Sequence, residues 1–229
     1  MSPQTRETTM SIDTSPGITF TGPSEIGYPR RNNALSDSEK ITQIEHHFAL
    51  IMNTLGLDLD HESLRRSPHR YAKMLVHELF SGLGVDRFPG ITTQENSFGD
   101  DQPLIETNIA VHSVCEHHFV PIVGYCHIAY IPGERVIGLS KLNRVTEYFA
   151  RRPQVQERLT CQIRETLTGV LETDDVAVVV DALHFCVRMR GIQDPDARTR
   201  SVSLGGRFRD GDGRRELLSA LPKASEVTF

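Results

Sequence analysis

The chain has 229 residues, of which 38% are hydrophobic and 24% are charged, and this balance predicts a globular protein with a sizeable core. The formal net charge of -5 argues against a basic nucleic-acid-binding protein. No apolar run approaches the length that crosses a bilayer, so we expect neither a nucleic acid nor a membrane as a partner.

The first residues favour a cytoplasmic protein. They lack the charged start and apolar core of a secretory signal, and Glu7, Asp13 and Glu25 argue against a transit peptide. Thiols stay reduced in the cytoplasm. The four cysteines are therefore candidates for metal binding or catalysis before disulfides.

Residues 1–35 are rich in Ser, Thr, Pro and Gly and predict a mobile N-terminal tail. Ser36 and Glu39 then have the spacing of a capping box, in which each side chain accepts a hydrogen bond from the other residue's backbone N–H. Apolar residues recur behind them at helical spacing as far as Leu55, and Gly56 ends this predicted helix.

A second helix is predicted from Ser67, as the N-cap, and Pro68, at the first helical position, to about Gly82. Residues 88–103 show no periodic pattern and predict a loop. The chain is therefore expected to begin its ordered part with helices.

A β-hairpin is predicted next. Residues 104–114 alternate between apolar and polar side chains, as a half-buried strand does. Residues 115–118 follow as a turn or strand end, and residues 124–131 form the second predicted strand.

Two further helices are predicted after the hairpin. Ser140 is expected to cap a helix that runs to Arg152. Pro153 is expected to break that helix and to start another, which carries an apolar stripe to about Leu171.

Residues 176–189 are apolar and β-branched and predict a long strand, and residues 199–204 predict a short one. This order of elements favours an α+β fold with an antiparallel sheet over the strict βα alternation of a parallel sheet. The expected organisation is a tail (1–35), a helical region (36–100) and a catalytic region (101–229) that is continuous with those helices.

The densest group of reactive side chains suggests a metal site. Cys115 and His118 are close in sequence, and Cys186 on the long predicted strand is a candidate third ligand. Thiolate and imidazole ligands favour zinc, and a set of three leaves a fourth position for water. His117 and His184 would remain as a general acid or base.

The competing interpretation is that these are packed cysteines and histidines satisfied by hydrogen bonds. Cys126 and Cys161 illustrate it, because each lies in an apolar pattern without ligand-like neighbours. We interpret both as structural.

Several basic residues and one serine are candidates for a polyphosphate site, two of them on the second predicted helix, three at the start of the third and two at the end of the long strand. They are Arg70, Lys73, Ser140, Lys141, Arg144, Arg188 and Arg190. A solvated surface is the alternative. The sequence has no Gly-rich P-loop, so such a site would not be of the NTPase type. Glu157 lies near the start of the fourth helix, where the helix dipole alone would favour a carboxylate.

With these residues identified, the chain resembles the GTP cyclohydrolase I family over about residues 36–220. The matching stretches are SPHRYAKMLVHELFSGL (67–83), SVCEHHFVPIVG (113–124), HIAYIP (127–132), VIGLSKLNR (136–144), FARRPQVQERLT (149–160), DALHFCVRMRGI (181–192) and SLGG (203–206). The candidate metal ligands alone predict only a zinc hydrolase. The substrate is inferred from the resemblance.

The resemblance implies a role for each matching residue. The zinc ligands would be Cys115, His118 and Cys186, and the proton-transfer residues would be His117 and His184. Glu157 would anchor guanine, with Gln156 beside it. The remaining substrate-binding residues would be Arg70, Lys73, Ser140, Lys141, Arg144 and Arg190, around the triphosphate.

The resemblance also implies the reaction and the assembly. GTP and water would give formate and 7,8-dihydroneopterin triphosphate, the first step of folate and pterin biosynthesis, with Zn2+ as cofactor. The implied fold is the tunnelling fold, an antiparallel sheet with helices on one face that pairs around a ring into a barrel. The implied assembly is a homodecamer of two pentamers with active sites between subunits.

Two regions depart from the family pattern. Residues 1–35 match nothing in it, and Arg198 and Arg200 are unexpected where the family has a Ser/Thr-rich stretch. Two rival interpretations are a tunnelling-fold relative acting on another purine or pterin, and an oligomeric binding protein without turnover. The complete Cys and His set argues against the first, and the presence of both His117 and His184 argues against the second.

Overall fold

The computed structural model describes residues 8–9, 28–29 and 33–222. Its centre is a five-stranded sheet in which only the short first pairing is parallel. In sheet order the strands are β6 (Pro153–Gln154), β3 (Leu104–Cys115), β4 (Pro121–Tyr130), β7 (Val176–His184) and β8 (Thr199–Leu204). The predicted hairpin is confirmed, since β3 and β4 are antiparallel partners.

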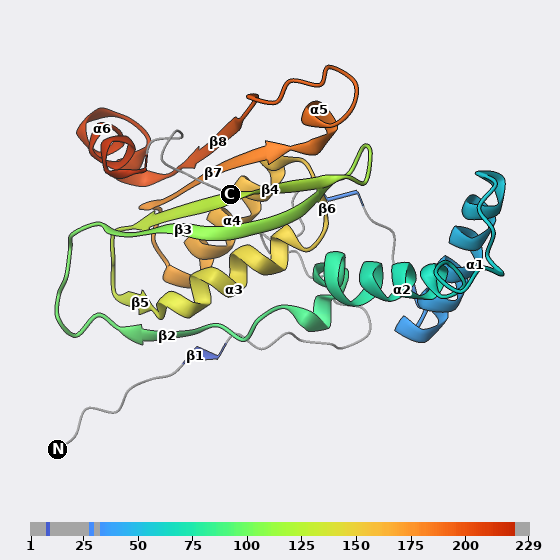
Figure 1. Cartoon of the computed structure of the whole chain (residues 1–229). Helices are drawn as coiled ribbons and strands as arrows, with labels where there is room; N and C mark the ends of the chain where they lie inside the picture. The colour runs from blue at the N-terminus through green and yellow to red at the C-terminus, as the bar shows by residue number, and fades with distance from the viewer. Residues whose placement is uncertain (1–7, 10–27, 30–32, 223–229) are drawn as a thin grey trace.

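The main core lies between this sheet and two helices, α3 (Leu139–Ala150) and α4 (Gln156–Leu171), which cover one face of it (Figure 1). Alternation along β7 decides which residues face them: Val176, Val178 and Val180 join the helices in the core. The fold is therefore α+β, as predicted.

The opposite face of the sheet is covered at one end by α6 (Gly211–Ala220), a helix that the sequence did not predict. Ala177 and Val179 of β7 point to this side and pack with Leu217 and Leu221. A turn of 3-10 helix, Gly206–Phe208, precedes α6. Helices therefore lie on both faces of the sheet.

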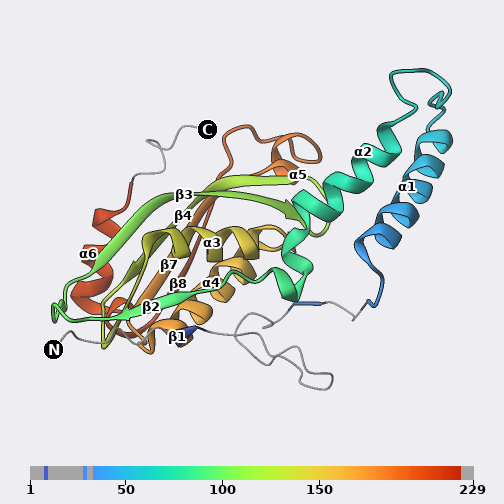
Figure 2. The same ribbon diagram turned by 90° about the horizontal axis from the view of Figure 1, so that it is seen from below.

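The N-terminal helices project from the sheet as an arm (Figure 2). The arm consists of α1 (Asp37–Thr54) and α2 (Ser67–Met74). The predicted capping box is confirmed, with the Ser36 backbone N–H donating to Glu39 Oε2 (2.7 Å) and the Glu39 N–H donating to Ser36 Oγ (3.3 Å). The two helices contact each other through the stacked rings of Phe48 and Tyr71.

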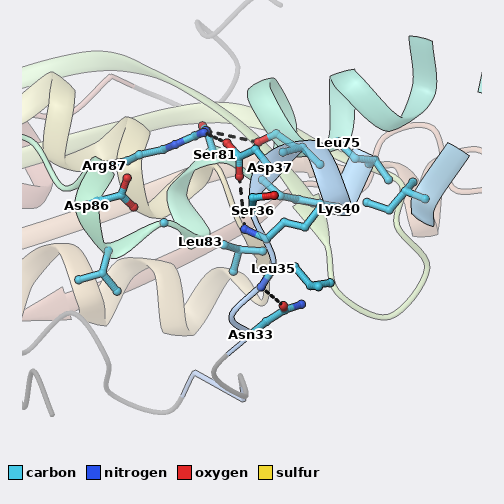
Figure 3. Close-up of a pocket in the computed structure, with 15 residues that line it drawn as sticks. Asn33, Leu35, Ser36, Asp37, Lys40, Leu75, Ser81, Leu83, Asp86 and Arg87 are labelled. Atoms are coloured by element: carbon cyan, nitrogen blue, oxygen red, sulfur yellow. Dashed lines mark hydrogen bonds and ion pairs between the residues drawn. The ribbon is translucent and has the colours of Figure 1, made fainter. Parts of the chain in front are cut away.

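A short irregular segment leads from the arm to the sheet. It contains a π-helical turn (Leu75–Leu79) and two turns of 3-10 helix (Ser81–Leu83 and Val85–Arg87). The structure has a cavity of about 660 Å3 between this segment and the start of α1 (Figure 3). Arg87 and Lys40 both pair with Asp37 at its edge, so charges on the two sides of the cavity neutralise each other.

Three predicted helix starts are wrong in detail. Arg66 precedes α2, so Ser67 is the first helical residue and not the cap. Gly138 precedes α3, which places Ser140 inside the helix. Pro153 belongs to strand β6, where it pairs with β3 before α4 begins. A cap depends on the backbone angles of a single residue, which nearby tertiary pairing can override.

Two predicted strand assignments also need correction. The predicted loop of residues 88–103 contains β2 (Thr92–Glu95), which pairs with β5 (Arg135–Ile137) and with β1 (Thr8–Thr9). The long predicted strand of residues 176–189 ends at His184 and is followed by the helical turn α5 (Phe185–Arg188). Apart from Thr8–Thr9, residues 28–29 and residues 33–35, the predicted tail lies outside the described residues.

Among the described residues, no helix combines the length and the apolar character needed to span a bilayer.

Candidate metal centre and surrounding site

The structure brings the predicted metal ligands together. Cys115 ends β3, His118 lies in the turn after it, and Cys186 lies in α5. Their ligand atoms are all within 4.8 Å of one another. Residues about 70 positions apart in the chain therefore form a group that can hold one metal ion.

The turn that carries Cys115 and His118 is closed by the backbone. The Cys115 N–H donates to Val120 O (2.8 Å), and the Phe119 N–H donates to Cys115 O (2.9 Å). Phe119 adopts a left-handed conformation with φ of 55°, which costs a non-glycine residue about 1 kcal/mol or more. The turn is tight, so the direction of both ligand side chains follows from its closure.

Cys186 reaches the cluster from α5 and not from the long strand on which the sequence placed it. Strand alternation would have put His184 and Cys186 on one face. Because β7 ends at His184, the chain turns helically and carries Cys186 towards Cys115 instead. Arg188 and Arg190, which the sequence placed at the end of the long strand, therefore lie beyond β7.

The donor set fits a thiophilic cation. Two thiols and one imidazole are the ligand types that zinc prefers. Burial and the neighbouring Cys115 thiol raise the pKa of Cys186. Two thiolates at this distance would repel each other, so a bound cation is what would stabilise both in the deprotonated state.

His117 lies on the exposed side of the cluster. Its Nδ1 is 3.7 Å from Cys115 Sγ, and its ring centre is 6.4 Å from that of His118. The side chain is 63% exposed, so it can reach a molecule that enters from solvent. Arg190, two residues after the end of α5, contacts His118 Nε2 at 3.0 Å and is exposed as well.

His184 is held by Gln156 on the inner side of the site. The Gln156 amide nitrogen donates to Val180 O and Thr199 O, both at 2.9 Å. This fixes the amide orientation, because the reverse orientation would set oxygen against two carbonyl oxygens. The remaining amide oxygen lies 2.7 Å from His184 Nε2 and can only accept.

The hydrogen of neutral His184 therefore resides on Nε2, and Nδ1 remains as the acceptor of the ring. Burial lowers the pKa of His184, and the nearby Glu157 carboxylate partly offsets that effect. His184 is thus a neutral imidazole with a defined tautomer at physiological pH. Gln156 is 1% exposed, and its contact with His184 could not be predicted from the spacing of the two residues.

Glu157 lies one residue further along α4 and is exposed. Burial lowers the pKa of the half-buried His184 and the Glu157 carboxylate acts to raise it, which is consistent with a position near the same site. Arg158 is the next residue of α4. Its side chain pairs with Glu116 in the turn of residues 115–118, which we call the metal-binding turn. Sequence reasoning missed this pair, because nothing in the spacing of the two residues indicates a contact.

The predicted phosphate-binding residues are dispersed in the single chain. Arg70 and Lys73 are exposed on the arm. Lys141 donates to Gly90 O (2.7 Å), and Ser140 and Arg144 are exposed nearby on α3. Of these predicted phosphate-binding residues, only Arg190 has a hydrogen bond or ion pair with the metal cluster in the described part of the chain.

The start of α3 is far from the cluster. Asn143 in its first turns donates to Glu106 near the start of β3 (2.6 Å), whereas Cys115 ends that strand. At about 3.3 Å per residue, the intervening part of β3 spans about 30 Å. The start of α3 and the metal cluster therefore lie toward opposite ends of β3 within one chain.

The two unexpected arginines have a structural role. Arg200 binds Asp181 through Nε (3.0 Å) and Nη2 (2.6 Å), and Arg198 lies 3.7 Å from the same carboxylate. Asp181 is 1% exposed on the sheet face opposite α3 and α4. The arginines neutralise a buried charge there and lie on the other side of the sheet from the core that carries Gln156.

Fold and site together define an α+β protein with a Cys-His-Cys metal centre beside a neutral histidine and an exposed one. Comparison with known proteins narrows this class. The family model of GTP cyclohydrolase I matches residues 44–221. The chain belongs to the GTP cyclohydrolase I family.

Curated relatives extend over most of both chains. A protein of Aeromonas salmonicida named GTP cyclohydrolase 1 is 51% identical over 190 residues, covering 82% of this chain and 87% of its own. Proteins of the same name from Flavobacterium johnsoniae and Yersinia enterocolitica are 48% and 47% identical, and cover 83% and 84% of this chain and 86% and 88% of their own.

Proposed function

We propose that the protein is a zinc-dependent GTP cyclohydrolase that converts GTP and water to formate and 7,8-dihydroneopterin triphosphate, the first step of folate and pterin biosynthesis in the cytoplasm. The observation that carries this proposal is the convergence of Cys115, His118 and Cys186 beside two histidines, in a chain that belongs to the GTP cyclohydrolase I family.

The donor set supports zinc as the metal. Cys115, His118 and Cys186 would hold it and leave one position for a further ligand. A zinc ion there would supply Lewis-acid chemistry and activate water near neutral pH.

The two histidines would divide the proton transfers. His184 keeps its Nε2 hydrogen on Gln156, so Nδ1 is the atom that would take up a proton. His117 is exposed beside Cys115 and would donate a proton to the guanine ring as the ring opens. A lowered pKa for His184 suits a base, because the neutral form is the one that accepts.

Glu157 would set the orientation of the base. A carboxylate accepts two parallel hydrogen bonds from the N1–H and the exocyclic amine of guanine. The exposure of Glu157 and its electrostatic interaction with His184 support a position beside the reacting ring. Gln156, the residue before Glu157, would act indirectly, through its hydrogen bond to His184.

A second copy of the chain would complete the site. The triphosphate would bind Arg70, Lys73, Ser140, Lys141, Arg144 and Arg190. The distance from the start of α3 to the cluster supports a division of these residues between neighbouring copies. We propose the tunnelling fold in a decamer of two pentamers, in which the sheets join into a barrel.

Exposed apolar side chains on the arm support such an assembly. Leu50, Ile51 and Leu55 of the first helix and its end are 50%, 53% and 72% exposed in the single chain. Side chains of this kind on one helix face are typical of an interface. A second copy would cover them.

Mixed oligomers test the shared site. Lys141→Ala and Cys186→Ser should each abolish turnover alone. Coexpressed, they should regain activity, because about one quarter of randomly formed shared sites would be intact. No recovery in verified mixed oligomers would contradict the division between copies.

The reaction itself is tested by incubating the purified, zinc-loaded protein with GTP and measuring formate and, after oxidation, pterin fluorescence. His117→Ala is the matched variant, because it should retain zinc and lose turnover. Formate and pterin in equal amounts are expected. Folded, zinc-loaded protein without either product would contradict the proposal and favour another purine substrate or a binding role.

A further inference from the structure

An ion pair joins the metal-binding turn to α4. Arg158 Nη1 donates to Glu116 Oε2 (2.6 Å), and Nη2 donates to Oε1 (3.3 Å). The two side chains are only 16% and 21% exposed.

The pair has a distinctive position in the site. Glu116 lies between the ligand Cys115 and the exposed His117. Arg158 follows Gln156 and Glu157 in the first turn of α4. The contact therefore links the part of the chain that holds the metal to the part that orients His184 and borders the proposed guanine pocket.

A two-point contact controls orientation as well as distance. Two parallel N–H···O bonds between guanidinium and carboxylate resist rotation, which a single ammonium group cannot do. The backbone adds one further link, from the Glu116 N–H to Gln154 O (3.1 Å). The ring of Tyr28 stacks near the guanidinium, whose carbon lies 5.5 Å from the ring centre.

The same helix offers a comparison. Arg164 is 22% exposed and donates through Nε to Ser203 Oγ (2.8 Å) on β8. It links α4 to the sheet through this hydrogen bond, and no hydrogen bond or ion pair among the described residues joins it to the metal-binding turn. A purely structural role would make Arg158 and Arg164 equivalent.

We propose that Arg158 is a positioning residue, whose two-point contact with Glu116 holds the metal-binding turn in register with α4. The metal site, His184 and Glu157 would then all face the same bound substrate. This inference rests on the proposed function, because it assigns the pair to that site.

The test compares Arg158→Met with Arg164→Met, each as the full-length oligomer loaded with zinc or with cobalt. The measurements are zinc affinity, the absorption spectrum of the cobalt form, kcat and KM for GTP. Arg158→Met should lose about 10- to 100-fold in kcat or in metal affinity and should change the cobalt spectrum. Arg164→Met should stay within about two-fold of the wild type in each.

Arg158→Lys and Glu116→Gln provide the second line of test, and they apply even if Arg158→Met fails to fold. Arg158→Lys keeps the charge but not the two-point contact, so it should restore activity only in part. In the cycle with Glu116→Gln, the double variant should be no worse than the poorer single variant. Additive losses, full activity of Arg158→Lys, or equal behaviour of Arg158→Met and Arg164→Met would overturn the proposal.

The cobalt spectrum separates this inference from the proposed function. If the wild-type protein releases no formate from GTP, the proposed function fails. The spectra of the Arg158 variants would still show whether the pair controls the geometry of the metal-binding turn, since they need no substrate.

Discussion

Replacing Gln156 by leucine should separate a positioning role from a direct contact with substrate. Leucine fills a similar volume but removes the three hydrogen bonds to Val180 O, Thr199 O and His184 Nε2. His184 then loses the partner that fixes its tautomer and its ring orientation. The carbonyl groups of the two strands lose a buried donor.

The size of the effect follows from burial. Gln156 is 1% exposed, so water cannot replace the lost partners without entering the core. Unsatisfied groups of this kind should lower the free energy of unfolding by about 2–4 kcal/mol. For a chain of this size the melting temperature should fall by about 5–15 °C. Loss of the partner of a proton-transfer histidine should lower kcat by about 10- to 100-fold.

The assay is steady-state formate release from GTP below the melting temperature of the variant, with zinc content measured in parallel. If Gln156 acts through His184, kcat falls while KM for GTP changes little. If Gln156 binds the substrate directly, as the family resemblance implies, KM rises. Arg164→Met is the control, because it also breaks a contact between α4 and β8 without touching His184. A kcat of Gln156→Leu within about two-fold of the wild type would show that Gln156 does not act through His184.

Two further predictions concern substrate binding and stability. Glu157→Ala should raise KM for GTP by about 10-fold or more while leaving the zinc content intact, since one charge-assisted bidentate contact is lost; titration with GTP checks this, and an unchanged KM would exclude the guanine-anchor role. Burial raises the pKa of the Cys126 thiol from 9.0 to about 12. The thiol therefore contributes stability below pH 9.0 that is lost as pH rises, at up to about 1.4 kcal/mol per pH unit, because only the unfolded state then releases its proton. Melting curves at pH values between about 8 and 10 should show a shallower decline for Cys126→Ala than for the wild type, and parallel declines would contradict this.

Local sequence patterns were sufficient to predict the helices and strands that are determined by their own residues. The capping box at Ser36 predicted the start of α1, and the alternation of residues 104–114 predicted β3. The strands β2 and β6 are short and polar, and they form only because β5 and β3 offer partners. α6 begins in a segment rich in Gly and Arg, and is held by Leu217 and Leu221 against the sheet.

In the candidate site, too, some features could be predicted from the sequence and others could not. The grouping of Cys115, His118 and Cys186 could be predicted because thiol and imidazole side chains that gather in one place are typical of a metal site. The element that carries Cys186 was predicted wrongly, since this residue lies in the helical turn α5 and not in a strand. The partners of His184 and Glu116 depend on how α4 packs against β7 and the metal-binding turn, and sequence spacing does not contain that information.

The most direct test of the account is metal-dependent turnover of GTP by the wild-type protein and by Cys186→Ser. Formate and pterin would be measured before chelation, after removal of the metal, and after zinc is restored. The account predicts that the wild type loses both products on chelation and regains both with zinc, whereas Cys186→Ser binds little zinc and forms neither. Full turnover in the presence of the chelator, or wild-type zinc content and rate in Cys186→Ser, would contradict it.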